Sequence, residues 1–211
     1  EYVLIANITN SNATNCIQIT SSNVTFDGAG YTIDGIDGPI TYGVYVYKPS
    51  TLNNVTIKNL EVSDWYFGMW YENAQNGSIV NNIVSLNTHT GIYLQSSGSN
   101  TLSNNTAFLN GFYGIYLSSS GSNILNNNIA DMNINTGISL QSSNNNILDS
   151  NSASFNSYVG ILLLSSNNNT LNNNTAYSND EVGIWLILSS NNNTLINNTA
   201  TFNGRYGILL Q

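Results

Sequence analysis

Three aspartates near the start of the chain are the residues whose type and spacing suit acid chemistry. Asp27, Asp34 and Asp37 are each followed by glycine. Two or three carboxylates that converge on a cleft are the apparatus of glycoside hydrolysis, and carboxylate and carbonyl oxygens together are the hard ligands that calcium takes. Asp-Gly is also ordinary turn chemistry, because glycine tolerates positive φ. We expect turns here, with a calcium site at these three residues as the alternative and no other cofactor.

Elimination chemistry finds no support in the spacing of the basic residues. Elimination on a polysaccharide would use a lysine or arginine base beside a cation. Lys48, Lys58 and Arg205 lie far apart in the repeating frame described below. We therefore predict that the chain is not an enzyme.

Copper transfer calls for cysteine, methionine and histidine in groups. The chain has Cys16, His89, Met69 and Met132, which are scattered. Cys16 is expected to be a small buried residue, and His89 a surface stacking residue. No metal-transfer role is predicted from these residues.

Aromatic residues recur at nearly constant spacing and are the strongest sign of a binding surface. If the segments that carry them are strands, their side chains point outwards and form a continuous stripe. Stacked rings suit sugar faces or a neighbouring protein, and they also stabilise a sheet without any partner. All three interpretations stay open. The predicted interaction stripe consists of Tyr45, Trp70, Tyr93, Tyr116, Leu162, Trp185, Leu209, Tyr66 and Phe112.

Asn-x-Ser/Thr acceptor sequences for glycosylation are frequent, but chance accounts for their number in a chain with 41 Asn. If the protein is secreted in a glycosylating organism, exposed turns are the sites to expect. The candidates are Asn7, Asn12, Asn54, Asn76, Asn168 and Asn192.

The composition excludes several classes of partner. Charged residues are 7% of the 211 residues and hydrophobic residues 41%, so the chain has a normal core and keeps itself in solution with amides and hydroxyls. A net charge of −8 does not neutralise phosphates, so we expect no nucleic acid partner. No apolar run reaches the ~20 residues that span a bilayer, so we expect no direct membrane span. Such a composition favours a secreted or cell-surface protein.

A repeat positions all of these residues. Gly-Ile-Tyr-Leu at Gly91 recurs in related form, and the glycines from Gly43 to Gly207 are 25, 23, 23, 23, 23, 23 and 24 residues apart. The extra residue of the last period is placed at Ile187 or Leu188, as a bulge. Each period holds short alternating segments separated by Asn- and Ser-rich turns, with no helical periodicity. A 23-residue period of this kind predicts a right-handed, single-stranded parallel β-helix of eight to nine coils.

Asparagines occupy one position in successive periods. Stacked amides at a turn hydrogen-bond along the axis of a β-helix, so a structural role is expected. The predicted asparagine ladder consists of Asn82, Asn105, Asn128, Asn151, Asn174 and Asn198.

The repeats, together with the segments Cys16 to Gly30 and Tyr31 to Gly35, resemble the NosD-like parallel β-helix repeat proteins of the pectin-lyase-like superfamily. The resemblance covers essentially the whole chain. It implies the β-helix fold, and it implies a setting in the large surface proteins of methanogenic archaea. It does not fix a function, because that superfamily includes lyases, hydrolases, adhesins and structural rods.

We predict one domain over residues 1–211. Residues 1–40 are expected to form irregular coils or a partial cap, residues 41–211 regular repeats, and the C-terminal end is expected to be uncapped. The predicted function is an extracellular structural module of a surface layer, sheath or filament, a glycoprotein that associates with itself or with other surface proteins through its coil ends and the stripe. The alternative is a β-helix that binds or cleaves polysaccharide.

Overall fold

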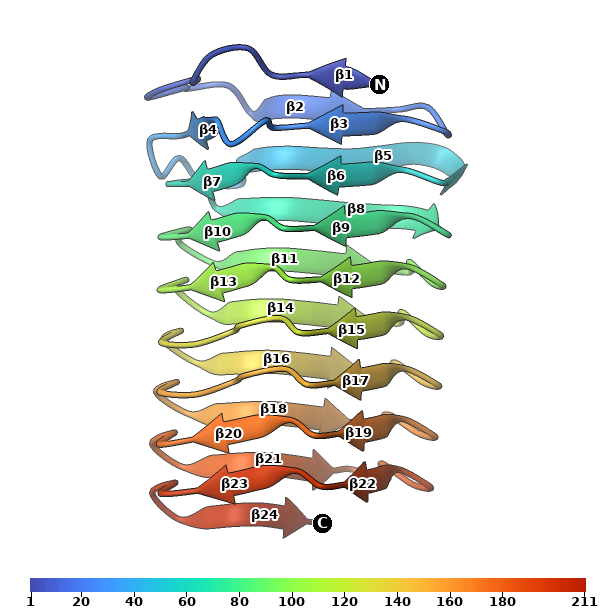
Figure 1. Cartoon of the computed structure of the whole chain (residues 1–211), viewed down its shortest axis with the longest axis vertical. Coiled ribbons are helices and arrows are strands. Elements are labelled where there is room, and N and C mark those ends of the chain that lie inside the picture. The colour runs from blue at the N-terminus through green and yellow to red at the C-terminus, as the bar shows by residue number, and fades with distance from the viewer.

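Short strands and tight turns alternate along the whole chain, because each alternating apolar run ends at Asn, Ser or Gly. The computed structural model describes all 211 residues, contains strands and no helix, and stacks one coil on the next (Figure 1). Each coil contributes one strand to each of up to three sheets, which we call A, B and C.

Sheets A and C each have nine strands in chain order, and sheet B is shorter. Sheet A contains β1 (Tyr2–Val3), β3 (Thr25–Asp27), β6 (Thr56–Lys58), β9 (Ser78–Val80), β12 (Thr101–Ser103), β15 (Ile124–Asn126), β17 (Ile147–Asp149), β19 (Thr170–Asn172) and β22 (Thr194–Ile196). Sheet B contains β4 (Thr32–Asp34), β7 (Glu61–Ser63), β10 (Ile83–Ser85) and β13 (Thr106–Phe108), and isolated bridges at Ile129 and Ser152 continue it to β20 (Thr175–Tyr177) and β23 (Thr199–Thr201). Sheet C contains β2 (Asn15–Ile19), β5 (Tyr42–Asn53), β8 (Phe67–Gln75), β11 (Thr90–Gln95), β14 (Tyr113–Ser118), β16 (Thr136–Gln141), β18 (Val159–Leu164), β21 (Val182–Ile187) and β24 (Tyr206–Leu210).

The register confirms the predicted parallel β-helix. Ile92 pairs with Ile115, which pairs with Ile138, so each coil advances by the 23 residues of the repeat. All of the strand pairs are parallel, and the nine strands of sheet C correspond to the upper number of predicted coils. The late insertion also lies where it was predicted. Leu164 still pairs with Ile187 at a spacing of 23, whereas Ser166 bonds to Ser190 at 24, and Leu188 between them is exposed.

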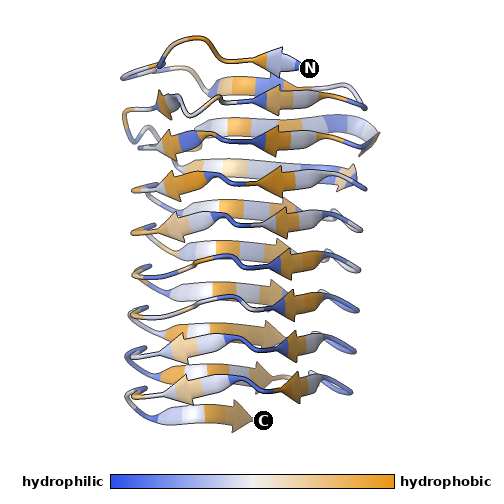
Figure 2. Ribbon diagram, viewed as in Figure 1, coloured by the Kyte–Doolittle hydropathy of each residue, from blue (hydrophilic) through white to orange (hydrophobic).

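The core is a column of apolar side chains inside the coils. It consists of 34 buried residues in one cluster, supplied by the inward positions of all three sheets. Figure 2 shows the hydrophobic positions recurring at the same places in successive coils. Full burial of one Leu or Ile is worth about 1.5–3 kcal/mol, so every coil that repeats the pattern adds to the stability of its neighbours.

The glycine column exists because a ladder of asparagines packs against it. A Cβ atom on Gly114 would lie 2.6 Å from Nδ2 of Asn133 and 2.8 Å from the carbonyl oxygen of Gly137. In the strands from β8 to β21, the glycine therefore leaves room for the amide in the turn of the next coil.

The predicted asparagine ladder lies inside the turn between sheets A and B. Oδ1 of Asn128 accepts from the backbone N (3.1 Å) and from Nδ2 (2.9 Å) of Asn105. Its own Nδ2 donates to Leu102 O and to Oδ1 of Asn151, each at 2.9 Å. Buried amides are tolerated because every donor and acceptor finds a partner in the coil above or below. Three further ladders repeat at other turns, from Asn87 to Asn203, from Asn100 to Asn193 and from Ser97 to Ser190.

Candidate functional site

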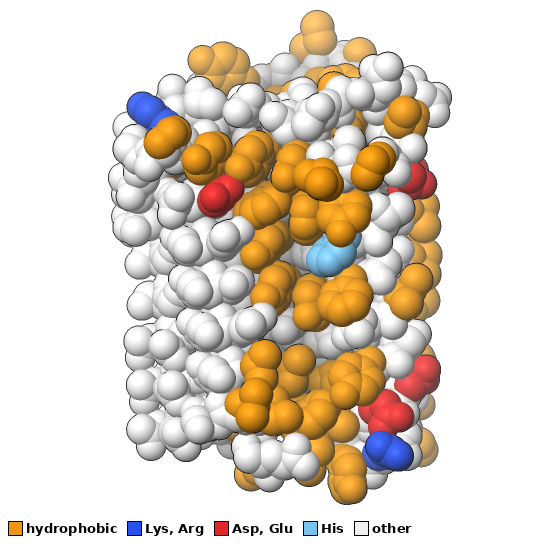
Figure 3. All heavy atoms as spheres, turned by 180° about the vertical axis from the view of Figure 1, so that it is seen from behind, with side chains coloured by type: hydrophobic (Ala, Val, Ile, Leu, Met, Phe, Trp, Pro, Cys, Tyr) orange, Lys and Arg blue, Asp and Glu red, His pale blue; other side chains and the backbone are white.

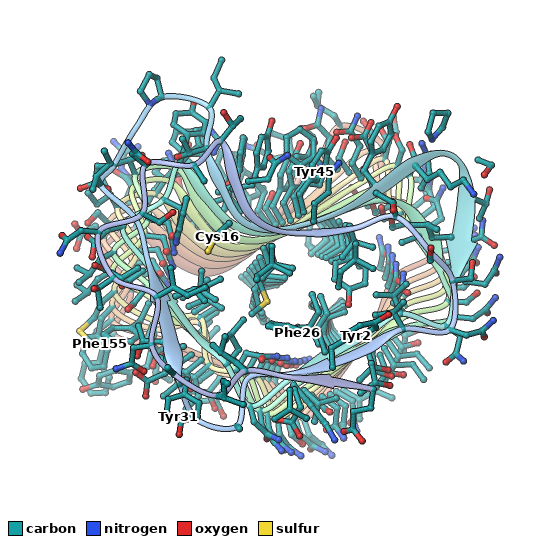
Figure 4. All side chains as sticks on the ribbon, turned by 90° about the horizontal axis from the view of Figure 1, so that it is seen from above. Tyr2, Cys16, Phe26, Tyr31, Tyr45 and Phe155 are labelled. Carbon is teal, nitrogen blue, oxygen red and sulfur yellow. The ribbon has the colours of Figure 1, made fainter.

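The predicted aromatic stripe lies on the outward face of sheet C. Tyr45 pairs with Trp70, and that column continues through Tyr93 and Tyr116 in exact register. Successive side chains of a strand point to opposite faces of the sheet. Ile92 and Leu94, and their equivalents in other coils, therefore point into the core, and the aromatic residues between them point outwards. Figure 4 shows Tyr45 projecting outwards from sheet C, on the opposite side of the coil from Tyr31.

The rings of neighbouring coils are in contact. The ring centroids of Trp70 and Tyr93 are 4.8 Å apart, and those of Tyr93 and Tyr116 are also 4.8 Å apart, nearly parallel. Two adjoining columns widen the stack. We call the whole group the upper patch, and it consists of Tyr42, Tyr45, Tyr47, Tyr66, Phe67, Trp70, His89, Tyr93, Phe112, Tyr113 and Tyr116.

The expected continuous stripe is divided in two. Ser139 occupies the next place in the column and is only 2% exposed. Beyond it lies a second group, which we call the lower patch: Tyr158, Leu162, Trp185, Tyr206 and Leu209. Figure 3 shows the two groups of apolar side chains on this face with a paler band between them. The small serine has no ring to bridge the two groups.

A carboxylate that the sequence did not single out borders the upper patch. The phenol of Tyr45 donates a hydrogen bond of 2.5 Å to Oε2 of Glu72. Burial raises the pKa of Tyr45 strongly, and the bond to Glu72 and its charge raise it further. Three coils further along, Tyr116 donates to Oε1 of Gln141 at 2.5 Å. The rings are thus flanked by oxygen acceptors on one side, in the column that also holds Gln95.

Burial raises the pKa of five phenols of the upper patch, which are therefore neutral hydrogen-bond donors at physiological pH: Tyr42, Tyr45, Tyr93, Tyr113 and Tyr116. Burial raises the pKa of Tyr113 to about 12, with smaller contributions from the nearby Tyr116 and Tyr93. His89 is stacked between Tyr66 and Phe112 at 5.0 and 5.3 Å, and burial lowers its pKa. Its ring is therefore uncharged at pH 7 as well, and this part of the face carries polar groups without positive charge.

The lower patch contains a cleft of about 300 Å³. Tyr158, Trp185 and Tyr206 contribute aromatic walls, and Glu181 and Arg205 form an ion pair of 3.2 Å at its edge. The indole Nε1 of Trp185 donates to Gln211 at 3.3 Å. Aromatic walls with a few placed polar groups are typical of ligand sites.

The three predicted calcium ligands are not brought together. Asp27 is on β3 in sheet A, where it bonds to the backbone N of Ala29 and to Lys58, and its pKa is lowered chiefly by the bond from Ala29. Asp34 is on β4 in sheet B, and Asp37 is an exposed turn residue. No group of three or more His, Cys, Asp or Glu side chains is close enough to hold a metal ion. Asp27-Gly28 lies at one corner of the coil, and Asp34-Gly35 and Asp37-Gly38 follow β4 at another.

A second carboxylate that the sequence did not single out lies beside Asp34. Asp34 accepts hydrogen bonds from the backbone N of Asn10 (3.1 Å) and Oγ of Ser63 (2.9 Å), and these outweigh its burial and lower its pKa. Burial raises the pKa of Asp64 to about 6, and the bond to Asp34 and the charges of Asp34 and Asp37 add to this. Asp64 escaped notice because no glycine follows it and 30 residues separate it from its partner.

The six predicted glycosylation sites, Asn7, Asn12, Asn54, Asn76, Asn168 and Asn192, are exposed. Their occupancy stays a prediction. No helix of a length and hydrophobicity that would cross a membrane is present.

Comparison with solved structures shows enzymes with the same fold. A variant of the periplasmic alginate epimerase AlgG superposes with a TM-score of 0.70 at 20% identity, covering 89% of this chain and 51% of that chain. The A-module of the Azotobacter vinelandii mannuronan C-5 epimerase AlgE4 has a TM-score of 0.59 at 14% identity, covering 97% and 86%. DFA-IIIase from Arthrobacter chlorophenolicus A6 has a TM-score of 0.68 at 16% identity, covering 88% and 50%. Comparison of the sequence with curated proteins finds no match.

These likenesses correct one prediction. We predicted that the chain is not an enzyme, and the structures that share its coil are epimerases and a DFA-IIIase. The prediction is wrong, and it considered only two kinds of catalytic group: a basic residue beside a cation, and the acids near the N-terminus. It overlooked Glu72, which the coiling of sheet C brings to Tyr45. At these identities the likeness itself shows the fold, and the chain spans only about half of the AlgG and DFA-IIIase chains.

A family model described as periplasmic copper-binding protein (NosD) matches residues 17–207. The soft ligands of this chain do not fit a copper ion. Cys16 lies on β2 of sheet C and is half-buried against the core, Met69 is buried and Met132 is exposed. His89 bonds through Nδ1 to Thr90 within the aromatic stack. Copper would require such side chains to converge. The expected archaeal surface setting stays a prediction. The match over nearly the whole length nevertheless shows that this chain belongs to the NosD family.

Proposed function

We propose that this β-helix acts on carbohydrate, and that it holds a polysaccharide strand along the outward face of sheet C. The observation that carries the proposal is the upper patch, where stacked rings run parallel to the axis and are bordered by Glu72, Gln95 and Gln141. Sugar rings stack on aromatic faces, and their hydroxyls pair with carboxylate and amide oxygens. The family description and the name of AlgG are both periplasmic, which supports a location outside the cytoplasm.

The charges on this face favour a neutral glycan. The chain has three Lys and Arg residues and a net charge of −8. Lys58 is paired with Glu1 and Asp27, and Arg205 with Glu181, which leaves Lys48 on β5 as the one basic side chain without an ion pair. Glu72 gives the upper patch a negative charge, and His89 is neutral at pH 7 because burial lowers its pKa. A polyuronate such as alginate would be repelled, so the ligand is expected to differ from that of the alginate epimerases.

Glu72 is the group on this face suited to proton transfer. Its carboxylate lies beside the rings that would hold the sugar, and one of its oxygens is fixed by Tyr45. General acid–base catalysis needs such a group within hydrogen-bond reach of the substrate. We place the modification of the bound glycan at Glu72.

The structural module that the sequence first suggested has less support. The structures with the same coil are carbohydrate-modifying enzymes by name, and the division of the stripe at Ser139 removes the uninterrupted surface on which a filament contact was predicted.

Affinity electrophoresis in gels containing polysaccharide tests the proposal. The panel contains neutral glycans (xylan, mixed-linkage glucan, mannan) and acidic ones (alginate, polygalacturonate). We expect retardation by at least one neutral glycan, loss of retardation in Trp70→Ala and Tyr93→Ala, and none by alginate. Tyr31→Ala is the matched control, because it removes an exposed tyrosine far from sheet C. Equal retardation of Trp70→Ala and the parent protein, or no retardation by any member of the panel, would contradict the proposal.

A further inference from the structure

A row of large apolar side chains runs along the corner between sheets B and C in left-handed backbone conformation. The five residues have φ between 54° and 58° and are 45–80% exposed. They occupy one place in successive coils, just before the second asparagine ladder. We call them the corner ridge: Leu86, Leu109, Met132, Phe155 and Phe202.

The residues at this corner are unfavourable in two ways: bulky side chains disfavour the left-handed backbone conformation, and apolar side chains disfavour exposure to water. Left-handed φ suits Gly, Asn and Asp, and a bulky side chain there is an outlier. The corresponding column after sheet A follows that preference with Asn81, Asn104, Asn127, Ser150, Asn173 and Asn197. The column after sheet C likewise holds serines, from Ser96 to Ser165. Single exposed apolar residues in left-handed conformation occur elsewhere, at Ile40 and Leu188, but only the corner ridge repeats the combination from coil to coil. Local rules that a sequence breaks in this way mark functional positions.

The ridge is continuous along the axis. Ser178 interrupts the column, but the ring of Tyr177 lies beside it, 5.4 Å from Phe155 and 5.2 Å from Phe202. Ile129 and Ile134 add exposed apolar surface next to the ridge, at 43% and 66%. Figure 4 shows Phe155 at the corner, away from Tyr45 on sheet C. Apolar side chains appear along that edge of the molecule in Figure 3, beside the aromatic face.

We propose that the corner ridge is the interface through which two copies of this chain associate side by side. The side chains of the ridge repeat at the coil spacing of about 4.8 Å. A second copy has the same repeat, so each side chain of one copy fits between two side chains of the other. The side chains of the ridge carry no charge and no hydrogen-bonding group, which disfavours a sugar or a charged partner. The nearby carboxylate of Asp131 is occupied by Ser152 and by the backbone of Ser154. The ridge itself therefore places no charged side chain at the contact between the two copies.

The exposed area is sufficient for a stable pair. Seven large apolar side chains, each about half exposed, together with the ring of Tyr177 provide a surface on the order of the 800 Å² that each partner buries in a standard interface. Pairing by a two-fold axis is the usual symmetry of such contacts. It would leave sheet C of both copies open, so this proposal stands independently of the carbohydrate site.

The backbone conformation allows a test in which loss of association is separated from loss of folding. The triple variant Leu109→Asn, Met132→Asn and Phe155→Asn removes apolar surface and puts a favoured residue at left-handed φ. Sedimentation equilibrium from about 1 μM to 1 mM, a range that spans ordinary association constants, should show a dimer for the parent protein and a monomer for the variant. The melting temperature of the variant, measured where both are monomeric, should be equal or higher. The control Ile124→Thr with Ile147→Thr removes two exposed isoleucines from sheet A and should leave the dimer intact.

Crosslinking gives a second readout that does not depend on the triple variant. With a short bismaleimide, Met132→Cys should give covalent dimers in far higher yield than Ile147→Cys, both in the presence of the half-buried Cys16. A parent protein that stays monomeric up to the highest concentration overturns the proposal. A triple variant that remains dimeric, or equal crosslinking of the two cysteine variants, also overturns it.

Discussion

Tyr45 and Glu72 are 27 residues apart in sequence and are joined by a hydrogen bond of 2.5 Å on the outer face of sheet C. The contact forms because Tyr45 lies opposite Trp70 in the register of β5 and β8, and Glu72 is the next outward residue of β8. It turns an aromatic stack into a face with a fixed carboxylate. That combination separates a possible site of chemistry from a purely structural stripe.

Replacing the carboxylate should release the phenol. Burial and Glu72 both raise the pKa of Tyr45, so Glu72→Gln is expected to lower that pKa towards, but not down to, the ordinary value near 10. Tyrosinate absorbance near 295 nm measures the titration, and Tyr45→Phe identifies its contribution. Glu61→Gln, which removes a carboxylate on sheet B, should leave the titration unchanged. An unaltered titration in Glu72→Gln would show that the bond contributes nothing.

The asparagine ladder should be costly to interrupt. In Asn128→Ala, the backbone N and Nδ2 of Asn105 lose their acceptor, and Leu102 O and Asn151 Oδ1 lose a donor. Each buried polar group left without a partner costs about 1–3 kcal/mol if the surrounding structure does not rearrange. We therefore expect the free energy of unfolding to fall by at least ~2 kcal/mol. Urea denaturation measures it.

A matched variant distinguishes the ladder from a general effect of losing an amide. Asn126 lies in the same coil, is part-exposed on β15 and has no side-chain hydrogen bond. Asn126→Ala should change the free energy of unfolding by less than ~0.5 kcal/mol. Equal losses in the two variants would mean that the ladder has no special weight.

The fold was predictable because the same sequence pattern recurs many times along the chain. One period of 23 residues fixes which side chains face inwards, since a slip of one residue would turn the whole set outwards. Ile92, Ile115 and Ile138 therefore locate the core of three coils at once, and the spacing change near Leu188 marks its own bulge. The asparagine columns follow from the same arithmetic.

The site was only partly predictable, because it depends on contacts between columns. The spacing places Tyr45 and Trp70 in one column, but Glu72 belongs to the neighbouring column, and its contact with Tyr45 depends on the side-chain directions. Asp34 and Asp64 meet at a corner where the coil is irregular, so the repeat pattern does not predict their contact. The corner ridge was missed for another reason: a leucine in a turn shows its positive φ only in three dimensions.

The carboxyl pair should make the stability of the N-terminal coils depend on pH. The pKa of Asp64 is raised from 3.8 to about 6, so its protonated form is favoured in the folded state. The stability linked to this proton is fully present below pH 4 and is lost as the pH rises through 6. Because Asp64 is only partly buried, solvent screening reduces the effect to about 1 kcal/mol.

Asp64→Asn removes this dependence. The variant should be more stable than the parent protein at pH 7, and the difference should disappear at pH 4. Urea denaturation at pH 4, 5.5 and 7 measures the free energy of unfolding. Asp149→Asn, a change on sheet A, serves as the control for the removal of one negative charge. A constant difference between Asp64→Asn and the parent protein at all three pH values would contradict the coupling.

The division of sheet C into two patches predicts a dependence on the length of the ligand. Trp185 lies in the lower patch, three coils below Tyr116, which is about 14 Å at the spacing between strands. A short oligosaccharide covers the upper patch alone, whereas a long chain also reaches the cleft between Tyr158 and Tyr206. Trp70→Ala should therefore abolish binding of both ligands. Trp185→Ala should leave the affinity for a short oligosaccharide unchanged and weaken binding of a long one by a factor of about ten, since one stacked aromatic is worth on the order of 1 kcal/mol. Isothermal titration with a size series of the neutral glycan that retards the parent protein measures both constants. Equal weakening of short and long ligands by Trp185→Ala would show that the two patches act as one site.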